Sequence, residues 1–153
     1  MKEIKIKLQD ELDVDDDCFE EVIAKVNFYT WIEFKLSHFE KARDHNERAL
    51  KLSSWSNITS LVNHAFITRR DGDETGAEKS LDKAEKLRKG RGGDRLMTDV
   101  EAELAYSYSR LNGPENLSRA IEIYARVVER QPEIYAWKYR FGLAHRRATH
   151  GNM

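Results

Sequence analysis

The sequence has few of the residues that crosslink or interrupt a chain. It contains one cysteine, two prolines and eight glycines in 153 residues. Because Cys18 has no second cysteine to pair with, no internal disulfide can form, which favours a reducing, cytoplasmic location. We interpret Cys18 as a buried or half-buried thiol, since a free cysteine packs as a small apolar residue.

Long apolar runs are also absent. None approaches the roughly 20 residues that cross a bilayer, and the chain start at Met1 has no apolar core followed by a cleavage site of small residues. We therefore expect a soluble, unsecreted protein with no membrane partner.

The patterns of catalytic and cofactor sites are missing as well. The histidines show neither the i,i+4 pairing nor the neighbouring cysteines of metal sites; they are His38, His45, His64, His145 and His150. No dinucleotide-binding, P-loop or nucleophile-elbow motif occurs, and the loop from Gly90 to Gly93 lacks the following lysine and hydroxyl residue of a phosphate loop. The sequence favours a protein that is not an enzyme and that has no metal and no cofactor.

What the sequence does contain is the composition of amphipathic helices, with 40% hydrophobic and 35% charged residues. Apolar residues recur every three or four positions, which predicts an all-α protein. The acidic run Asp13 to Asp17 provides an N-cap for the first helix, and Glu20 and Glu21 in the first turn suit its dipole. Helices are expected to about Leu36, over 40–52, 57–70 and 75–89, from Thr98 or Asp99 to Leu111, and over 133–147. Asn112 to Pro114 separate the helix that ends at Leu111 from a further one, which is marked by apolar residues between Leu117 and Val128 and is closed by Pro132.

Small and apolar residues recur within these helices at one spacing. The pattern is seen as Ala77/Leu81/Ala84 and Ala120/Tyr124/Val127, and more weakly as Ala42/Asn46/Ala49. It is typical of the second helix of a tetratricopeptide repeat, a helical hairpin of about 34 residues in which small side chains let two helices approach closely. We predict one domain over residues 1–153, a tetratricopeptide-repeat solenoid of about three repeats plus an unpaired C-terminal helix.

The unpaired last helix predicts an interface. No partner helix follows it in the sequence, so the apolar residues Trp137 and Phe141 lack a helix of their own to cover them. Either the chain is a fragment, or a protein partner or a second copy packs there.

Stacked hairpins curve and leave a concave surface lined by the first helix of each pair. Residues expected on or beside these helices combine cations with aromatic rings. They are Lys35, Arg69, Arg70, Arg110, Lys138, Arg140, Arg146 and Arg147, with Trp31, Trp55, Tyr106 and Tyr139. Guanidinium groups neutralise phosphates and rings stack on bases, so this lining suits single-stranded nucleic acid, although the net charge is only −1.

Four segments occur in a characteristic order, with a long interval before the third repeat: residues 27–32, 80–85, 103–110 and 119–120. They resemble the opening repeats of the interferon-induced proteins with tetratricopeptide repeats. The resemblance covers about residues 15 to 148. That family holds the 5′ end of single-stranded viral RNA in a positively charged tunnel and acts in cytosolic antiviral defence, a part of innate immunity. By resemblance, Tyr106 lies near the RNA 5′ end, Arg110 binds a phosphate, and a further RNA-binding arginine is Arg146 or Arg147.

Two differences from the family keep a second hypothesis open. Its members are several times longer than this chain, and their tunnel is closed by later repeats that have no counterpart here. One hypothesis is therefore a short RNA-binding relative. The other is a protein-interaction scaffold that binds a peptide in the same groove or self-associates through its last helix.

Overall fold

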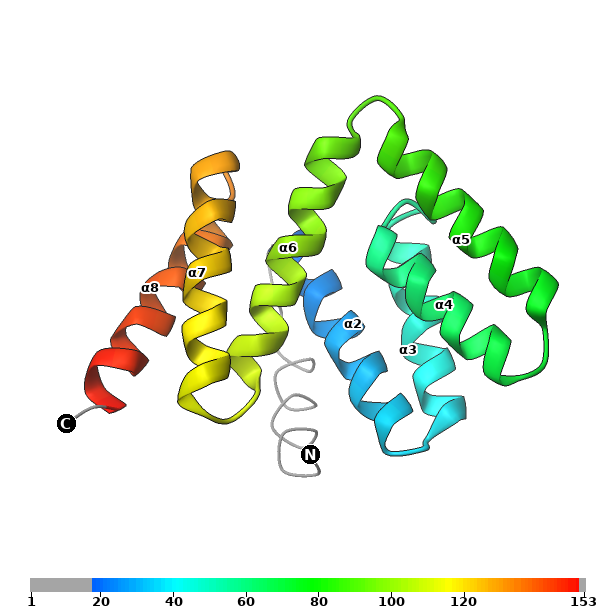
Figure 1. Ribbon diagram of the computed structural model, residues 1–153, viewed down its shortest axis with the longest axis horizontal. Coiled ribbons are helices and arrows are strands. Elements are labelled where there is room, and N and C mark those ends of the chain that lie inside the picture. Colours follow the sequence, from blue (N-terminus) through cyan, green and yellow to red (C-terminus); the bar gives the residue numbers. More distant parts are fainter. Residues whose placement is uncertain (1–17, 152–153) are drawn as a thin grey trace. The chain divides into compact units, whose positions relative to one another are not determined.

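The computed structural model describes residues 18–151, which form helices and no strand (Figure 1). The helices are α2 (Phe19–Lys35), α3 (Phe39–Leu52), α4 (Ile58–Arg70), α5 (Glu74–Lys89), α6 (Gly93–Arg110), α7 (Pro114–Arg130) and α8 (Tyr135–Gly151). Over these residues the prediction of an all-α protein is confirmed.

The first four described helices begin and end within a residue or two of their predicted bounds, and the caps of α4 and α5 are readable in the sequence. The Asn57 side chain accepts a hydrogen bond from the Ser60 amide and starts α4, and Asp73 does the same for Gly76 at the start of α5. Between them Gly72 has a φ of 88°, which glycine adopts without strain. Glu20 and Glu21 occupy the first turn of α2 as predicted, while the cap predicted within Asp13 to Asp17 lies outside the described residues.

The predicted start of α6 at Thr98 or Asp99 is wrong, because the helix begins at Gly93. Gly92 has a φ of 84° and completes the turn by itself, and its carbonyl already accepts the first helical hydrogen bond from the Leu96 amide at 3.1 Å. Glycines that read as a loop therefore end one helix and start the next. Thr98 is buried within α6.

The chain divides into two compact units, Met1–Met97 and Thr98–Met153, and α6 begins in the first and continues in the second. In unit 1, α2 packs on α3 and α4 packs on α5 as antiparallel hairpins, and α4 also contacts α2 and α3. The prediction of a single repeat domain over residues 1–153 stays a prediction.

Buried alanines hold the hairpins of unit 1 together. Ala42 and Ala49 of α3 and Ala77 of α5 are fully buried, as the spacing predicts for residues at close helix crossings. A polar network joins three helices of this unit: the Ser60 hydroxyl donates to the side-chain oxygen of Asn27, and the Asn46 amide donates to the Ser60 carbonyl. Such a buried network favours one packing arrangement over others, although the side-chain oxygen of Asn46 has no hydrogen-bond partner.

Unit 2 consists of the α6 residues from Thr98 onward with α7 and α8. Ala120 of α7 is fully buried, again as predicted. Two contacts tie the helices together: Arg130 of α7 forms an ion pair with Glu101 of α6 at 2.8 Å, and α8 packs on α7. Residues on the rest of α8, such as Tyr135 and Tyr139, are exposed.

Candidate nucleic-acid interface

The most uneven distribution of charge in unit 2 is on α8. Between Tyr135 and Gly151 the sequence has no aspartate or glutamate. It has four cationic residues in the same helix, which are Lys138, Arg140, Arg146 and Arg147. By contrast, α7 carries three acidic and three basic residues, so it is neutral. The local excess of positive charge on α8 is hidden by a whole-chain net charge of −1.

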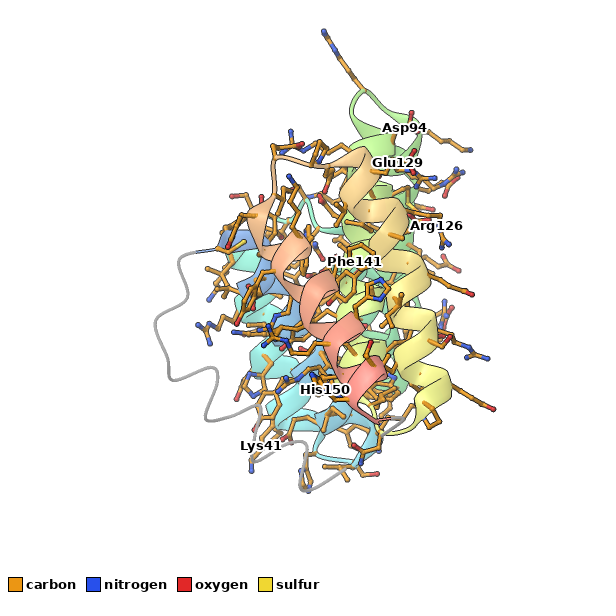
Figure 2. All side chains as sticks on the ribbon, turned by 90° about the vertical axis from the view of Figure 1, so that its left-hand side faces the viewer. Lys41, Asp94, Arg126, Glu129, Phe141 and His150 are labelled. Atoms are coloured by element: carbon orange, nitrogen blue, oxygen red, sulfur yellow. The ribbon has the colours of Figure 1, made fainter. Side chains whose placement is uncertain are left out.

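The solvent-facing side of α8 combines this charge with exposed aromatic rings (Figure 2, where Phe141 and His150 mark the helix). Tyr135 is 77% exposed and Tyr139 is 53% exposed. With Gly142 and Arg146 they are spaced by four, three and four residues, which places all four along one side of a helix. We call these four residues the tyrosine stripe.

The middle of the tyrosine stripe is open. A Cβ atom placed on Gly142 would have no atom within 4 Å, so nothing stands between Tyr139 and Arg146 at that turn. The stripe extends for about 16 Å along the helix axis at the usual rise per residue. It therefore offers flat rings and a guanidinium group on one accessible surface.

Two further guanidinium groups meet beside Tyr106. Arg110 at the end of α6 lies 5.9 Å from the centre of the Tyr106 ring, and Arg140 of α8 lies 5.4 Å from it. Because the ring face is negative, it attracts both side chains. The result is a pair of cations contributed by two helices, which we call the arginine pair.

The structure brings the predicted RNA-binding residues together in one unit but gives them different environments. Tyr106 is 0% exposed, so its ring is not available to stack on a base. Arg147 donates to the Ser109 carbonyl at 2.8 Å and thereby ties α8 to α6. Arg146 is exposed and belongs to the tyrosine stripe. Of the two arginines that the resemblance left open, Arg146 is the one that faces solvent without such a bond.

The two residues predicted to form an interface are also less exposed than the sequence analysis expected. Trp137 is 1% exposed and its ring lies 6.2 Å from that of Tyr124, so it is packed inside unit 2 against α7. Its ring nitrogen is buried without a hydrogen-bond partner. Phe141 is half-buried and packs edge-on against His145 at 4.7 Å. The apolar side of α8 is thus largely covered by this chain itself.

Tyr135 is a candidate residue that the sequence reasoning missed. A usable signal was present, because Tyr135 and Tyr139 are i,i+4 neighbours in a segment with cations and no carboxylate. Aromatic residues in a helix are more often core than surface, and only the packing of Trp137 on α7 shows which side of α8 is turned inward.

One polar pair in unit 1 has the composition of a nucleophile and a base. His64 Nδ1 lies 2.6 Å from the Ser80 hydroxyl, and burial lowers the pKa of His64 below its ordinary 6.5. Ser80 is buried between α4 and α5, so a substrate has no access to the hydroxyl. The pair holds two helices together. Among residues 18–151 no group of three His, Cys, Asp or Glu side chains is arranged to hold a metal ion.

These observations define an all-α protein of packed helical hairpins with one basic, tyrosine-bearing helix face. Within the described residues, every helix is too short or too polar to cross a membrane. The sequence matches no protein-family model, and it shows no significant similarity to a curated protein or to a solved structure.

Proposed function

We propose that this chain is a tetratricopeptide-repeat protein that binds single-stranded RNA through the tyrosine stripe and the arginine pair of unit 2. The repeat assignment is supported by the antiparallel hairpins α2/α3 and α4/α5 and by the buried alanines at the predicted helix crossings. A role in cytoplasmic antiviral defence follows from the family resemblance and is part of the same proposal.

The observation that carries the proposal is the composition of the exposed side of α8. A helix that serves only as a soluble surface normally mixes both signs of charge, whereas this one presents cations and tyrosines without a carboxylate. Phosphate groups are attracted to such a surface, and the release of their counterions favours binding. Exposed rings strengthen binding by roughly 1 to 3 kcal/mol for each base that stacks on them, and this stacking has no sequence preference.

Each group has a distinct part in this mode of binding. Arg110 and Arg140 are each suited to a phosphate, since a guanidinium group can direct two N–H donors at its oxygens. Tyr135 and Tyr139 are suited to bases, and Arg146 to the next phosphate along the strand. The proposal differs from the family resemblance in one respect: Tyr106 is buried near Arg110 and Arg140 and does not stack on RNA.

A mobility-shift titration against short single-stranded RNA tests the proposal. RNAs that carry a triphosphate, a monophosphate or a hydroxyl group at the 5′ end are compared in parallel. We expect Arg110→Glu and Arg146→Glu to weaken binding at least about tenfold, because each change replaces attraction to a phosphate by repulsion. Tyr139→Ala removes a stacking ring and is expected to weaken binding about fivefold or more.

Arg126→Glu is the matched control. Arg126 is an exposed arginine of the same unit but lies on α7, away from the tyrosine stripe (Figure 2). If Arg126→Glu weakens binding as much as Arg146→Glu, the effect belongs to overall charge and the proposed site is wrong. Wild-type protein that does not bind any of the RNAs at low salt would refute the function itself. Circular dichroism verifies that each variant keeps its helices.

A further inference from the structure

Unit 1 contains a separate surface feature, a pocket between α2 and α4. Its volume is about 180 Å³. The lining consists of Thr30, Trp31, Phe34, Lys35, Asn63, Phe66 and Ile67. Three aromatic rings and an isoleucine thus surround it, and Lys35 is the one charged residue among them. We call it the α2/α4 pocket.

The aromatic rings of the α2/α4 pocket are held in place and remain accessible. Trp31 stacks on the buried Phe28, with the ring centres 6.0 Å apart, and Phe34 packs edge-on against Phe39 at 5.4 Å. Phe66 is 58% exposed at the rim. A large exposed ring beside a preformed apolar hollow is unfavourable in water and is relieved when another apolar group covers it.

One cation, Lys35, lines the α2/α4 pocket, and a second, Arg70, lies over Phe39, the ring that packs against the lining residue Phe34. Lys35 lies over the Trp31 ring at 5.9 Å, and Arg70 lies over the Phe39 ring at 3.6 Å. Neither forms an ion pair with a carboxylate between residues 18 and 151. The carboxylates that follow Arg70 in the sequence are engaged elsewhere, since Asp71 pairs with Arg43 and Glu74 pairs with Arg69. The rim is therefore positive, with charge free to meet an anionic group.

We propose that the α2/α4 pocket docks a peptide segment of a protein partner in which a leucine or phenylalanine is flanked by aspartate or glutamate. A cavity of about 150 Å³ holds one benzene ring, so a pocket of this size suits one large apolar side chain. The flanking carboxylates meet Lys35 and Arg70 at the rim. The amide nitrogen of Asn63 is buried without a hydrogen-bond partner, and rotated into the pocket it donates to a peptide carbonyl.

A nucleic-acid base fits this pocket less well than an apolar side chain. The lining offers few polar groups, and the Thr30 hydroxyl is already donated to the Val26 carbonyl at 2.8 Å. A base pushed in here would leave polar edge groups without partners, which is costly, whereas a leucine leaves none. The peptide site is thus distinct in chemistry and in place from the RNA site proposed in unit 2.

Fluorescence anisotropy with a designed probe tests the inference. The probe is a fluorescein-labelled synthetic peptide of glycine and serine that carries two leucines, each between aspartates. Two matched peptides replace either the leucines by serine or the aspartates by lysine. We expect saturable binding of the probe alone, and binding of both matched peptides at least about tenfold weaker.

Variants with matched controls locate the site. Phe66→Ser and Lys35→Glu are expected to weaken probe binding at least about tenfold. Phe19→Ser controls for the first, because Phe19 is 51% exposed in the same unit but lies outside the pocket. Lys51→Glu controls for the second, because Lys51 is likewise an exposed lysine in the last turn of its helix. Both controls are expected to bind the probe within about twofold of wild type.

Three results of the binding assays would overturn the inference: a probe that binds no more tightly than its serine counterpart, control variants as weak as the pocket variants, or an oligouridine competitor that displaces the probe from wild type. The last would assign the pocket to nucleic acid. An independent reading on wild-type protein comes from NMR, where the Trp31 indole and Asn63 side-chain amide signals should shift on addition of the peptide. Unshifted signals would also overturn it.

Discussion

The salt dependence of RNA binding is the most quantitative consequence of the charge on unit 2. We assign four cationic side chains of unit 2 to RNA: Arg110 and Arg140, which are half-buried near Tyr106, and Lys138 and Arg146, which are exposed on α8. For single strands, each neutralised phosphate contributes about −0.7 to the slope of log affinity against log salt. The expected slope is therefore about −2.8, and affinity should fall about 50-fold between about 50 and 200 mM salt.

Removing one contact changes this slope by a predictable amount. Arg146→Gln leaves three cations, so the slope should become about −2.1 and the loss over the same salt range about 18-fold. Arg126→Gln on α7 should leave the slope unchanged, because Arg126 lies off the stripe. The assay is fluorescence anisotropy of labelled single-stranded RNA at several salt concentrations. A wild-type slope shallower than about −1, or equal slopes for wild type and Arg146→Gln, would refute the reasoning.

Further predictions concern stability, measured by urea unfolding. Ala120→Trp should destabilise unit 2 by about 1 to 3 kcal/mol, because the residue is fully buried and the ring overpacks the crossing; an unchanged midpoint would contradict this. Asn57→Ala removes the cap of α4 and a hydrogen-bond acceptor for Asn27, so it should lower the free energy of unfolding by about 1 to 2 kcal/mol. A smaller decrease would mean that the hydrogen bond to Asn27 adds nothing to stability. Burial lowers the pKa of His64, so protonation favours the unfolded chain and stability falls as the pH drops below about 6.5. His64→Gln, which can still bond to Ser80, should make the loss of stability between about pH 7 and pH 5 smaller, and an equal or larger loss would argue against the assigned cause.

The helices of unit 1 were predictable because their ends carry local chemistry. Asn57, Gly72 and Asp73 specify a cap or a turn through their own side chains or backbone freedom, so no distant contact is needed to locate the boundary. The start of α6 was missed for the opposite reason. Gly92 and Gly93 are equally compatible with a flexible loop and with a single sharp turn, and only the hydrogen bonds of the folded chain distinguish the two.

The candidate site was predictable in composition but not in orientation. The cations of α8 and Arg110 are evident in the sequence, as is the lack of carboxylates beside them. Which rings face water is decided by packing between helices. Trp137 packs near Tyr124 and Tyr106 is 0% exposed, so two of the aromatic residues that the sequence analysis named are enclosed, whereas Tyr135, which it did not name, is exposed.

The enclosed indole of Trp137 supplies a built-in spectroscopic reporter. It is the single tryptophan of unit 2, whereas Trp31 and Trp55 belong to unit 1 and are partly open to water. An indole surrounded by side chains emits at shorter wavelength than a hydrated one. In a variant with phenylalanine at positions 31 and 55, the red shift of emission would follow the melting of unit 2 alone. Comparing this red shift with the loss of ellipticity of the whole chain would show whether the two units unfold in one cooperative transition or one after the other.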